Sequence, residues 1–247
     1  MKKLLFFIVL INQFLFAQNL LEKGNSLYKK GDYQNAITAY ENVFRSKKHS
    51  AELYFNLGNC YYKLNKVAPA IFNFEKALLL NPDDAEIQNN LRFAQKRTID
   101  DIKIVSKVGF RKLLSDATMR YHYDTWAWIA IGFSGLFLAF FLLYFYMMRT
   151  LPKRLLFTAM IMAFFGTIIC IAAAYFAKNI FDNNQPAIVF SEKTSVKTEP
   201  KTEAPDSFVL HEGTKVLVLE NLDSWKKIEL ADGKTGWILS SAVRMLK

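Results

Sequence analysis

Two long uncharged runs constrain this chain more than any other feature of its sequence. Trp126–Met148 and Leu155–Ala177 each contain 23 residues without a charged side chain. As helices they would each be about 34 Å long at ~1.5 Å per residue, which is enough to cross a hydrocarbon core about 30 Å thick. Because only residues 149–154 separate the runs, we predict two transmembrane helices, 126–148 and 155–177, joined as an antiparallel hairpin.

Small side chains recur every three or four residues along the second run, and they predict a face on which the first helix can pack closely. Gly132 and Gly135 are predicted to form the matching notch on the first run. Neither run contains Asp, Glu, Lys, Arg or His. Because transport paths through a membrane usually need such groups, the hairpin is interpreted as an anchor. The small residues are Ala159, Ala163, Gly166, Cys170 and Ala173.

The formal net charge of +10 gathers beside the apolar runs rather than on one basic segment. That distribution is typical of membrane topology and argues against a nucleic-acid partner. The loop 149–154 contains Arg149, Lys153 and Arg154, so the positive-inside rule predicts that it is cytoplasmic. Both flanking soluble regions are then expected outside the cytoplasm.

The first 17 residues have the pattern of a secretory signal peptide. Lys2 and Lys3 precede the apolar run Leu4–Ile11, and Ala17 is a small residue at a cleavage point. The alternative is an uncleaved N-terminal anchor. With the hairpin, this segment predicts a bacterial inner-membrane protein that crosses the membrane twice and has both soluble domains in the periplasm.

Residues 18–98 contain an internal repeat with a constant offset of 34 residues. The pattern resembles the tetratricopeptide repeat, which implies two full repeats of paired helices followed by a capping helix. Because three repeats are usually needed for independent stability, docking on the hairpin or on a partner is expected. The residues that best match the repeat pattern are Tyr54, Leu57, Gly58, Tyr61, Ala70, Phe74, Ala77 and Pro82.

The tetratricopeptide resemblance implies a concave groove lined by the first helix of each repeat. Asn side chains there are expected to hydrogen-bond an extended peptide, aromatic rings to pack against it, and Lys side chains to favour an acidic partner. The alternative is that these residues are merely exposed or contact a neighbouring subunit. The predicted peptide-binding residues are Asn25, Tyr28, Lys29, Phe55, Asn59, Tyr62, Lys63 and Phe93.

Residues 99–125 connect the repeats to the first apolar run. Lys103, Lys107 and Arg111 are spaced four residues apart, which is consistent with a basic stripe on a helix at the membrane surface. A plain juxtamembrane linker is the equal alternative.

The C-terminal region, residues 186–247, changes to short β-type runs around the strong hairpin turn Asp232-Gly233. Leu210–Val216, Asp223–Ile228 and Asp232–Ile238 resemble a bacterial SH3-like domain. That resemblance implies a small all-β barrel that binds peptides or cell-wall fragments. Trp225 and Trp237 are its candidate ligand contacts, since large aromatic rings dominate interface energies; the alternative is that both belong to the core.

The fold class is therefore a multidomain membrane protein with an all-α tetratricopeptide repeat, a two-helix transmembrane hairpin and a small all-β SH3-like barrel. This order of modules resembles the BatE-like family of aerotolerance (Bat) operon proteins. The resemblance implies a membrane-anchored scaffold linked to oxygen or envelope stress. The expected partners are membrane proteins with von Willebrand factor A-type domains from the same operon, together with membrane lipid.

Catalysis is not expected from this sequence. It contains no phosphate-binding loop, no Gly-x-Ser-x-Gly motif and no metal-ligand cluster. His49, His122 and His211 fall in three different segments. No cofactor and no metal are expected. The alternative function is a membrane protein that binds peptidoglycan through the SH3-like region.

Overall fold

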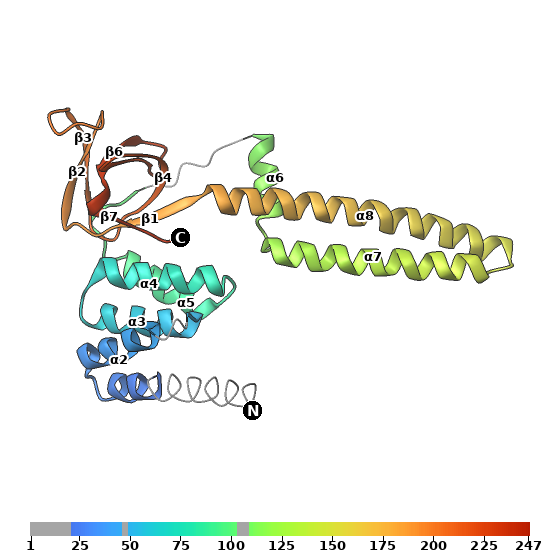
Figure 1. Ribbon diagram of the computed structural model, residues 1–247, viewed down its shortest axis with the longest axis horizontal. Coiled ribbons are helices and arrows are strands. Elements are labelled where there is room, and N and C mark those ends of the chain that lie inside the picture. The colour runs from blue at the N-terminus through green and yellow to red at the C-terminus, as the bar shows by residue number, and fades with distance from the viewer. Residues whose placement is uncertain (1–20, 46–48, 103–108) are drawn as a thin grey trace, which may run out of the picture. The chain divides into compact units, whose positions relative to one another are not determined.

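The computed structural model describes residues 21–45, 49–102 and 109–247 (Figure 1). The chain divides into two compact units. One combines the segment up to Val105 with Gln185–Lys247, and the other is Ser106–Asn184. The predicted signal peptide, and Lys103 and Lys107 of the predicted basic stripe, lie outside the described residues.

The first unit begins with antiparallel helices in the order expected for the repeats. Residues 21–29 are helical, and four helices follow. Gly31 and Asn65, which are 34 residues apart, both have positive φ angles, +80° and +58°. Each ends the turn after the first helix of its repeat, so the two repeats share a left-handed turn position that glycine and asparagine adopt readily. The helices are α2 Tyr33–Arg45, α3 Ala51–Lys63, α4 Val67–Leu80 and α5 Ala85–Gln95.

Close approach of the paired helices depends on a glycine in each repeat. A Cβ on Gly58 would lie 2.6 Å from the Phe74 ring, and one on Gly24 would lie 2.3 Å from the Tyr40 ring. Phe74 and Tyr40 are both almost fully buried. The side chain of Asp84 accepts hydrogen bonds from the Glu86 and Ile87 amides and so caps the start of α5.

The C-terminal region forms a seven-stranded sheet in which the pairs of neighbouring strands are antiparallel. Its strand order is β3-β2-β6-β5-β4-β1-β7. The sheet is open, because no ladder joins the outer strands β3 and β7 of this described order, so the closed barrel expected from the sequence is not shown. The strands are β1 Gln185–Val189, β2 Lys193–Lys197, β3 Asp206–His211, β4 Lys215–Leu222, β5 Trp225–Glu229, β6 Thr235–Leu239 and β7 Val243–Met245.

The sheet curls around one apolar core. Val196, Ile228 and Ile238 are fully buried in it. Gly233 has a φ of +87° and turns the chain between β5 and β6, as predicted for the Asp232-Gly233 pair. The segment after Phe190 looks like a linker by composition, but it contains β2 because Val196 points into this core.

The β region also packs against helix α4 of the second repeat. Ile188 of β1 and Leu246 pack in the same buried cluster as Ile71 and Phe74 of α4. The Lys215 Nζ lies 2.7 Å from a carboxylate oxygen of Glu75 on α4. The support that two repeats require is therefore supplied by the chain's own β region.

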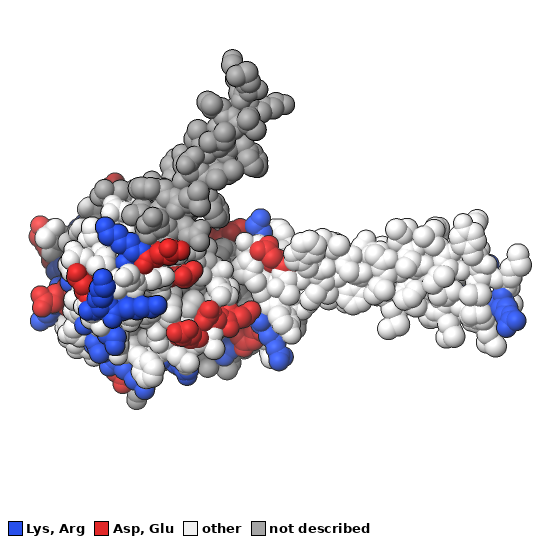
Figure 2. All heavy atoms as spheres, turned by 90° about the horizontal axis from the view of Figure 1, so that it is seen from below, with Lys and Arg blue, Asp and Glu red and all other residues white. Residues whose placement is uncertain are grey.

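The second unit consists of α6 Phe110–Thr118, α7 Tyr123–Tyr146 and α8 Thr150–Asn183. The α7 and α8 helices are long and apolar enough to span a membrane. They run side by side in opposite directions (Figure 1). The visible surface along this pair is uncharged over most of its length, and Lys and Arg appear at the end where the loop joins the two helices (Figure 2).

The contact between α7 and α8 uses only part of the predicted small-residue face. Ala163, Cys170 and Ala177 are buried, and a Cβ on Gly166 would lie 3.0 Å from the Phe133 ring. The predicted notch is wrong: a Cβ added to Gly132 or Gly135 would have nothing within 4 Å. The two glycines therefore lie away from α8, and the intervening Phe133 ring fills the space above Gly166.

Candidate functional site

The first helices of the repeats are held next to one another by pairs of asparagines. Asn56 donates from Nδ2 to the Asn25 Oδ1 at 3.1 Å, and Asn90 donates to the Asn59 Oδ1 at 2.9 Å. Each pair is separated by 31 residues, and the two pairs are related by the 34-residue repeat. The same helix-to-helix bond is therefore made twice along the predicted groove.

These bonds change the expected role of the predicted amides. The carboxamide oxygens of Asn25 and Asn59 already accept hydrogen bonds within the chain, and the Tyr40 hydroxyl also donates to Asn25 at 2.7 Å. Among the described contacts the Asn25 oxygen accepts two hydrogen bonds and the Asn59 oxygen accepts one. The Asn59 oxygen and both amide nitrogens can therefore still meet a peptide. Asn56 and Asn90 were missed as members of this ladder, although their own 34-residue spacing in the sequence was a signal.

A cation stacks on an aromatic ring at Tyr62, one of the predicted groove residues. The Arg97 guanidinium stacks 3.8 Å from the centroid of the Tyr62 ring. Its Nη1 also donates to the Tyr62 carbonyl oxygen and to Asn65 Oδ1, at 3.2 and 3.0 Å. Arg97 was not among the predicted groove residues, although it follows Lys29 and Lys63 at the same 34-residue spacing, which was a signal in the sequence.

The other predicted groove residues divide into exposed and half-buried groups. Lys29 and Lys63 are exposed, and the Phe93 side chain is 55% exposed with the Lys96 ammonium over its ring. Tyr28 packs edge-on against Tyr33, and Phe55 packs against Phe74. The exposed part of the groove therefore presents lysine, arginine and aromatic side chains.

The two predicted tryptophans lie on one face of neighbouring strands. In the ladder between β5 and β6, Trp225 is opposite Leu239 and Lys227 is opposite Trp237. Opposed residues and residues two apart in a strand share a face, and Ile228 and Ile238 occupy the other face in the core. Trp225 is buried, whereas Trp237 is half-buried with the Lys227 Nζ 5.9 Å from its ring centroid.

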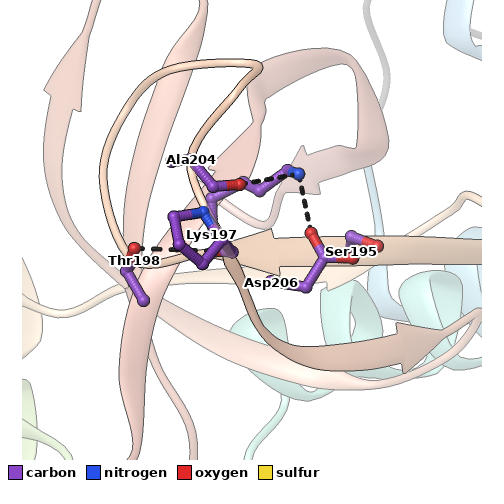
Figure 3. A network of polar contacts seen from close by, with 6 residues as sticks. Ser195, Lys197, Thr198, Ala204 and Asp206 are labelled. Carbon is purple, nitrogen blue, oxygen red and sulfur yellow. Dashed lines mark hydrogen bonds and ion pairs between the residues drawn. The ribbon is translucent and has the colours of Figure 1, made fainter.

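A polar network fixes the strand beside Trp237 (Figure 3). Lys197, which is opposite Trp237 on β2, places its ammonium 2.7 Å from an Asp206 carboxylate oxygen and donates to the Ala204 carbonyl oxygen at 3.0 Å. The Ser195 hydroxyl donates to the other Asp206 oxygen at 2.9 Å. The hydrogen bonds from Lys197 and Ser195 lower the pKa of Asp206, so this carboxylate neutralises Lys197 and Lys227 is the cation beside the tryptophan.

The chemistry of the described residues offers little for catalysis. No group of three or more His, Cys, Asp and Glu side chains within them is arranged to hold a metal ion. His211 contacts Asp100 at 2.8 Å, and His49 contacts the Tyr54 hydroxyl at 2.9 Å. Cys60 is fully buried, and that burial raises its pKa to about 12, so its thiol is unreactive.

Comparison with known proteins assigns the helical repeats. The family model for the tetratricopeptide repeat matches residues 51–84, and a second model, the TPR repeat, matches residues 24–65. Residues 24–84 are tetratricopeptide repeats. Such repeats imply a protein-interaction scaffold, and proteins built from them are generally not enzymes.

Similar segments occur in much longer proteins. Sperm-associated antigen 1 of Mus musculus is 32% identical over 79 residues, which cover 32% of this chain and 9% of that protein. Hsp70-Hsp90 organizing protein of Triticum aestivum is 34% identical over 61 residues, covering 25% of this chain and 10% of that protein. Tetratricopeptide repeat protein 16 of Homo sapiens is 27% identical over 70 residues, 28% of this chain and 8% of that protein. The chain therefore spans about a tenth of the length of these relatives.

Proposed function

We propose that this protein is a non-enzymatic, membrane-anchored scaffold that presents its tetratricopeptide groove and its β region on the same, periplasmic side of a bacterial inner membrane. The observation that carries the proposal is that the first unit is built from two separate segments of the chain. It joins residues before the apolar hairpin to residues after it, through the ion pair between Glu75 and Lys215 and the hydrogen bond between Asp100 and Thr214.

That packing has a topological consequence. If α7 and α8 both cross a bilayer, the chain returns to the side from which it entered, and the two halves of the first unit can meet. A single crossing would separate them across the membrane. Arg149 before α8, Lys153 and Arg154 at the start of α8, and the N-terminal signal pattern support the assignment of that common side to the periplasm.

The partner proposed for the groove is a protein with an acidic segment. The BatE-like resemblance narrows this to membrane proteins with von Willebrand factor A-type domains encoded in the same operon, in a complex linked to aerotolerance or envelope stress. The lysine, arginine and aromatic side chains of the groove support the acidic character of the partner.

Crosslinking in native membranes followed by mass spectrometry tests this proposal. A photoreactive amino acid at Phe93, which is largely exposed, should capture a membrane protein, and Lys29→Glu with Lys63→Glu should reduce capture several-fold by charge repulsion. Lys30→Glu is the matched control, because this exposed lysine lies in the turn after the first helix. Equal capture by the double variant and the control would contradict the groove assignment.

Peptidoglycan binding is the second candidate function, and the half-buried Trp237 beside Lys227 favours it. The described sheet is open rather than a closed barrel. The assignment of residues 186–247 as an SH3-like domain is therefore part of this proposal. Sedimentation of the full chain in nanodiscs with purified peptidoglycan tests it, with Trp237→Ala expected to lose binding. If the wild-type chain stays in the supernatant, the scaffold function remains as the sole proposal.

A further inference from the structure

A cavity of about 410 Å³ borders α3 on a different face from that helix's groove residues. Its wall from that helix consists of Tyr54, Leu57 and Tyr61. At 100° per residue the centre of these positions lies about 120° around the helix from Phe55 and Tyr62 of the groove, on a neighbouring face. The cavity also includes residues of α2, α4 and the β region, all within the first unit. We refer to it as the junction pocket.

The interior of the junction pocket is aromatic. The rings of Phe44 and Tyr54 lie 4.9 Å apart at one end, and Phe72 packs edge-on against Phe190, which follows β1, at 5.6 Å. All four rings are half-buried rather than buried, so each keeps surface that a ligand can cover. Such a lining favours a large apolar side chain.

The rim of the pocket carries unbalanced positive charge. The Arg244 guanidinium stacks 4.2 Å from the Phe190 ring centroid. Neither Arg244 nor Lys66 forms a hydrogen bond through its side chain or an ion pair with a described residue. Among the described residues that line the pocket, Glu41 has the one carboxylate, which accepts a hydrogen bond from the Tyr61 hydroxyl at 3.1 Å. A planar guanidinium held by an aromatic ring is preorganised for a carboxylate ligand.

We propose that the junction pocket binds a segment of a partner protein in which a large apolar side chain lies next to Asp or Glu. The apolar side chain enters between Phe44 and Phe72, and the carboxylate pairs with Arg244 and Lys66. Because Arg244 and Phe190 come from the β region and Phe44, Tyr54 and Phe72 come from the repeats, the site exists only while the two are packed together. It is separate from the groove on which the proposed function rests.

Selection of a random decapeptide display library on the full chain in nanodiscs tests the proposal. Enriched peptides should have Asp or Glu adjacent to Phe, Trp, Tyr or Leu. Their retention should fall about fivefold or more in Arg244→Met, and Arg244→Lys should restore part of it by keeping the charge without the planar fork. Arg244 is exposed, so neither variant is expected to affect folding, which the melting temperature checks.

Lys63→Met is the matched control, because Lys63 is an exposed cation on the groove side of the same helix. Retention should be unchanged in this variant. Peptides whose retention depends on Lys63 and not on Arg244 would assign the binding to the groove and overturn the proposal. Enrichment without acidic residues, or no enrichment over empty nanodiscs, would also overturn it, whereas neither result would affect the groove experiment with Phe93.

Discussion

Asp100 connects the end of the repeats to the β region through three hydrogen bonds. Its carboxylate accepts from the His211 amide at 2.7 Å, from the His211 ring Nδ1 at 2.8 Å and from the Thr214 hydroxyl at 2.5 Å. The Asp100 side chain is only 12% exposed. Removing it would leave these donors without an acceptor in a poorly hydrated place.

Asp100→Ala should therefore destabilise the first unit by about 1–3 kcal/mol, the cost of leaving buried donors unpaired. Asp101→Ala is the matched control, because Asp101 is exposed and its loss should change stability by less than about 0.5 kcal/mol. Calorimetric unfolding of the full chain in micelles measures the difference. Equal effects of the two substitutions would show that the Asp100 contacts do not stabilise the fold.

The same carboxylate gives stability a dependence on pH. Burial by itself would raise the pKa of Asp100, but the hydrogen bonds from His211 and Thr214 outweigh burial and lower it below the ordinary value of 3.8. A lowered pKa in the folded state means that the contribution is present above pH ~3.8 and is lost as the pH falls through the folded pKa. The difference in melting temperature between wild type and Asp100→Asn should shrink as the pH falls below ~4. A difference that persists unchanged to about pH 3 would contradict this.

Gly58 provides a test of packing inside the repeat. Alanine there places a Cβ 2.6 Å from the Phe74 ring, and Phe74 is fully buried and cannot move aside. Gly58→Ala should lower stability by about 1–3 kcal/mol, as overpacking does, despite the better helix propensity of alanine. Gly132→Ala, where nothing lies within 4 Å, is the control in calorimetry and should not destabilise the first unit. A neutral Gly58→Ala would mean that the helices can separate without cost.

At the scale of elements, local patterns predicted much of what the structure contains. The 34-residue period placed the repeat helices, and the Asp232-Gly233 pair placed a hairpin turn. The contact of α4 with β1 and β4 was not predictable, because Glu75 and Lys215 are 140 residues apart and no period links them. The positions that line the groove were predicted from the repeat. The hydrogen bonds between asparagines on neighbouring helices were not predicted, because they depend on which face each helix turns to its neighbour.

The contact between α7 and α8 also could not be predicted in detail from the sequence pattern. Composition identified small residues on α8, but it did not determine that Phe133 rather than Gly132 or Gly135 would meet Gly166. Gly166→Leu should therefore disturb the pair by colliding with Phe133, while Gly135→Leu should be tolerated. Loss of amide protection in α7 and α8, measured by hydrogen exchange in nanodiscs, should appear only in the first variant. Equal protection in both would show that the Gly166 contact is not required.

At the scale of the whole molecule, the first unit is discontinuous in sequence and the second is inserted into it. Its halves must therefore remain on one side of any membrane that α7 and α8 cross. The junction pocket makes this measurable, because Lys66 precedes the hairpin, Arg244 follows it, and both are exposed at the same cavity. Cysteines at these two positions should be within reach of one short bis-maleimide.

In spheroplasts, Lys66→Cys and Arg244→Cys should each react with a membrane-impermeant maleimide, because the proposed topology places both outside. The double variant should then form the intramolecular crosslink. Arg154→Cys, near the start of α8, should react only after the membrane is opened. The native cysteines are buried, so the wild-type chain gives the background. Protection of both Lys66→Cys and Arg244→Cys until lysis would place the first unit in the cytoplasm. Reaction of only one of them would refute the paired crossing, because the packing of the first unit requires both residues on the same side of the membrane.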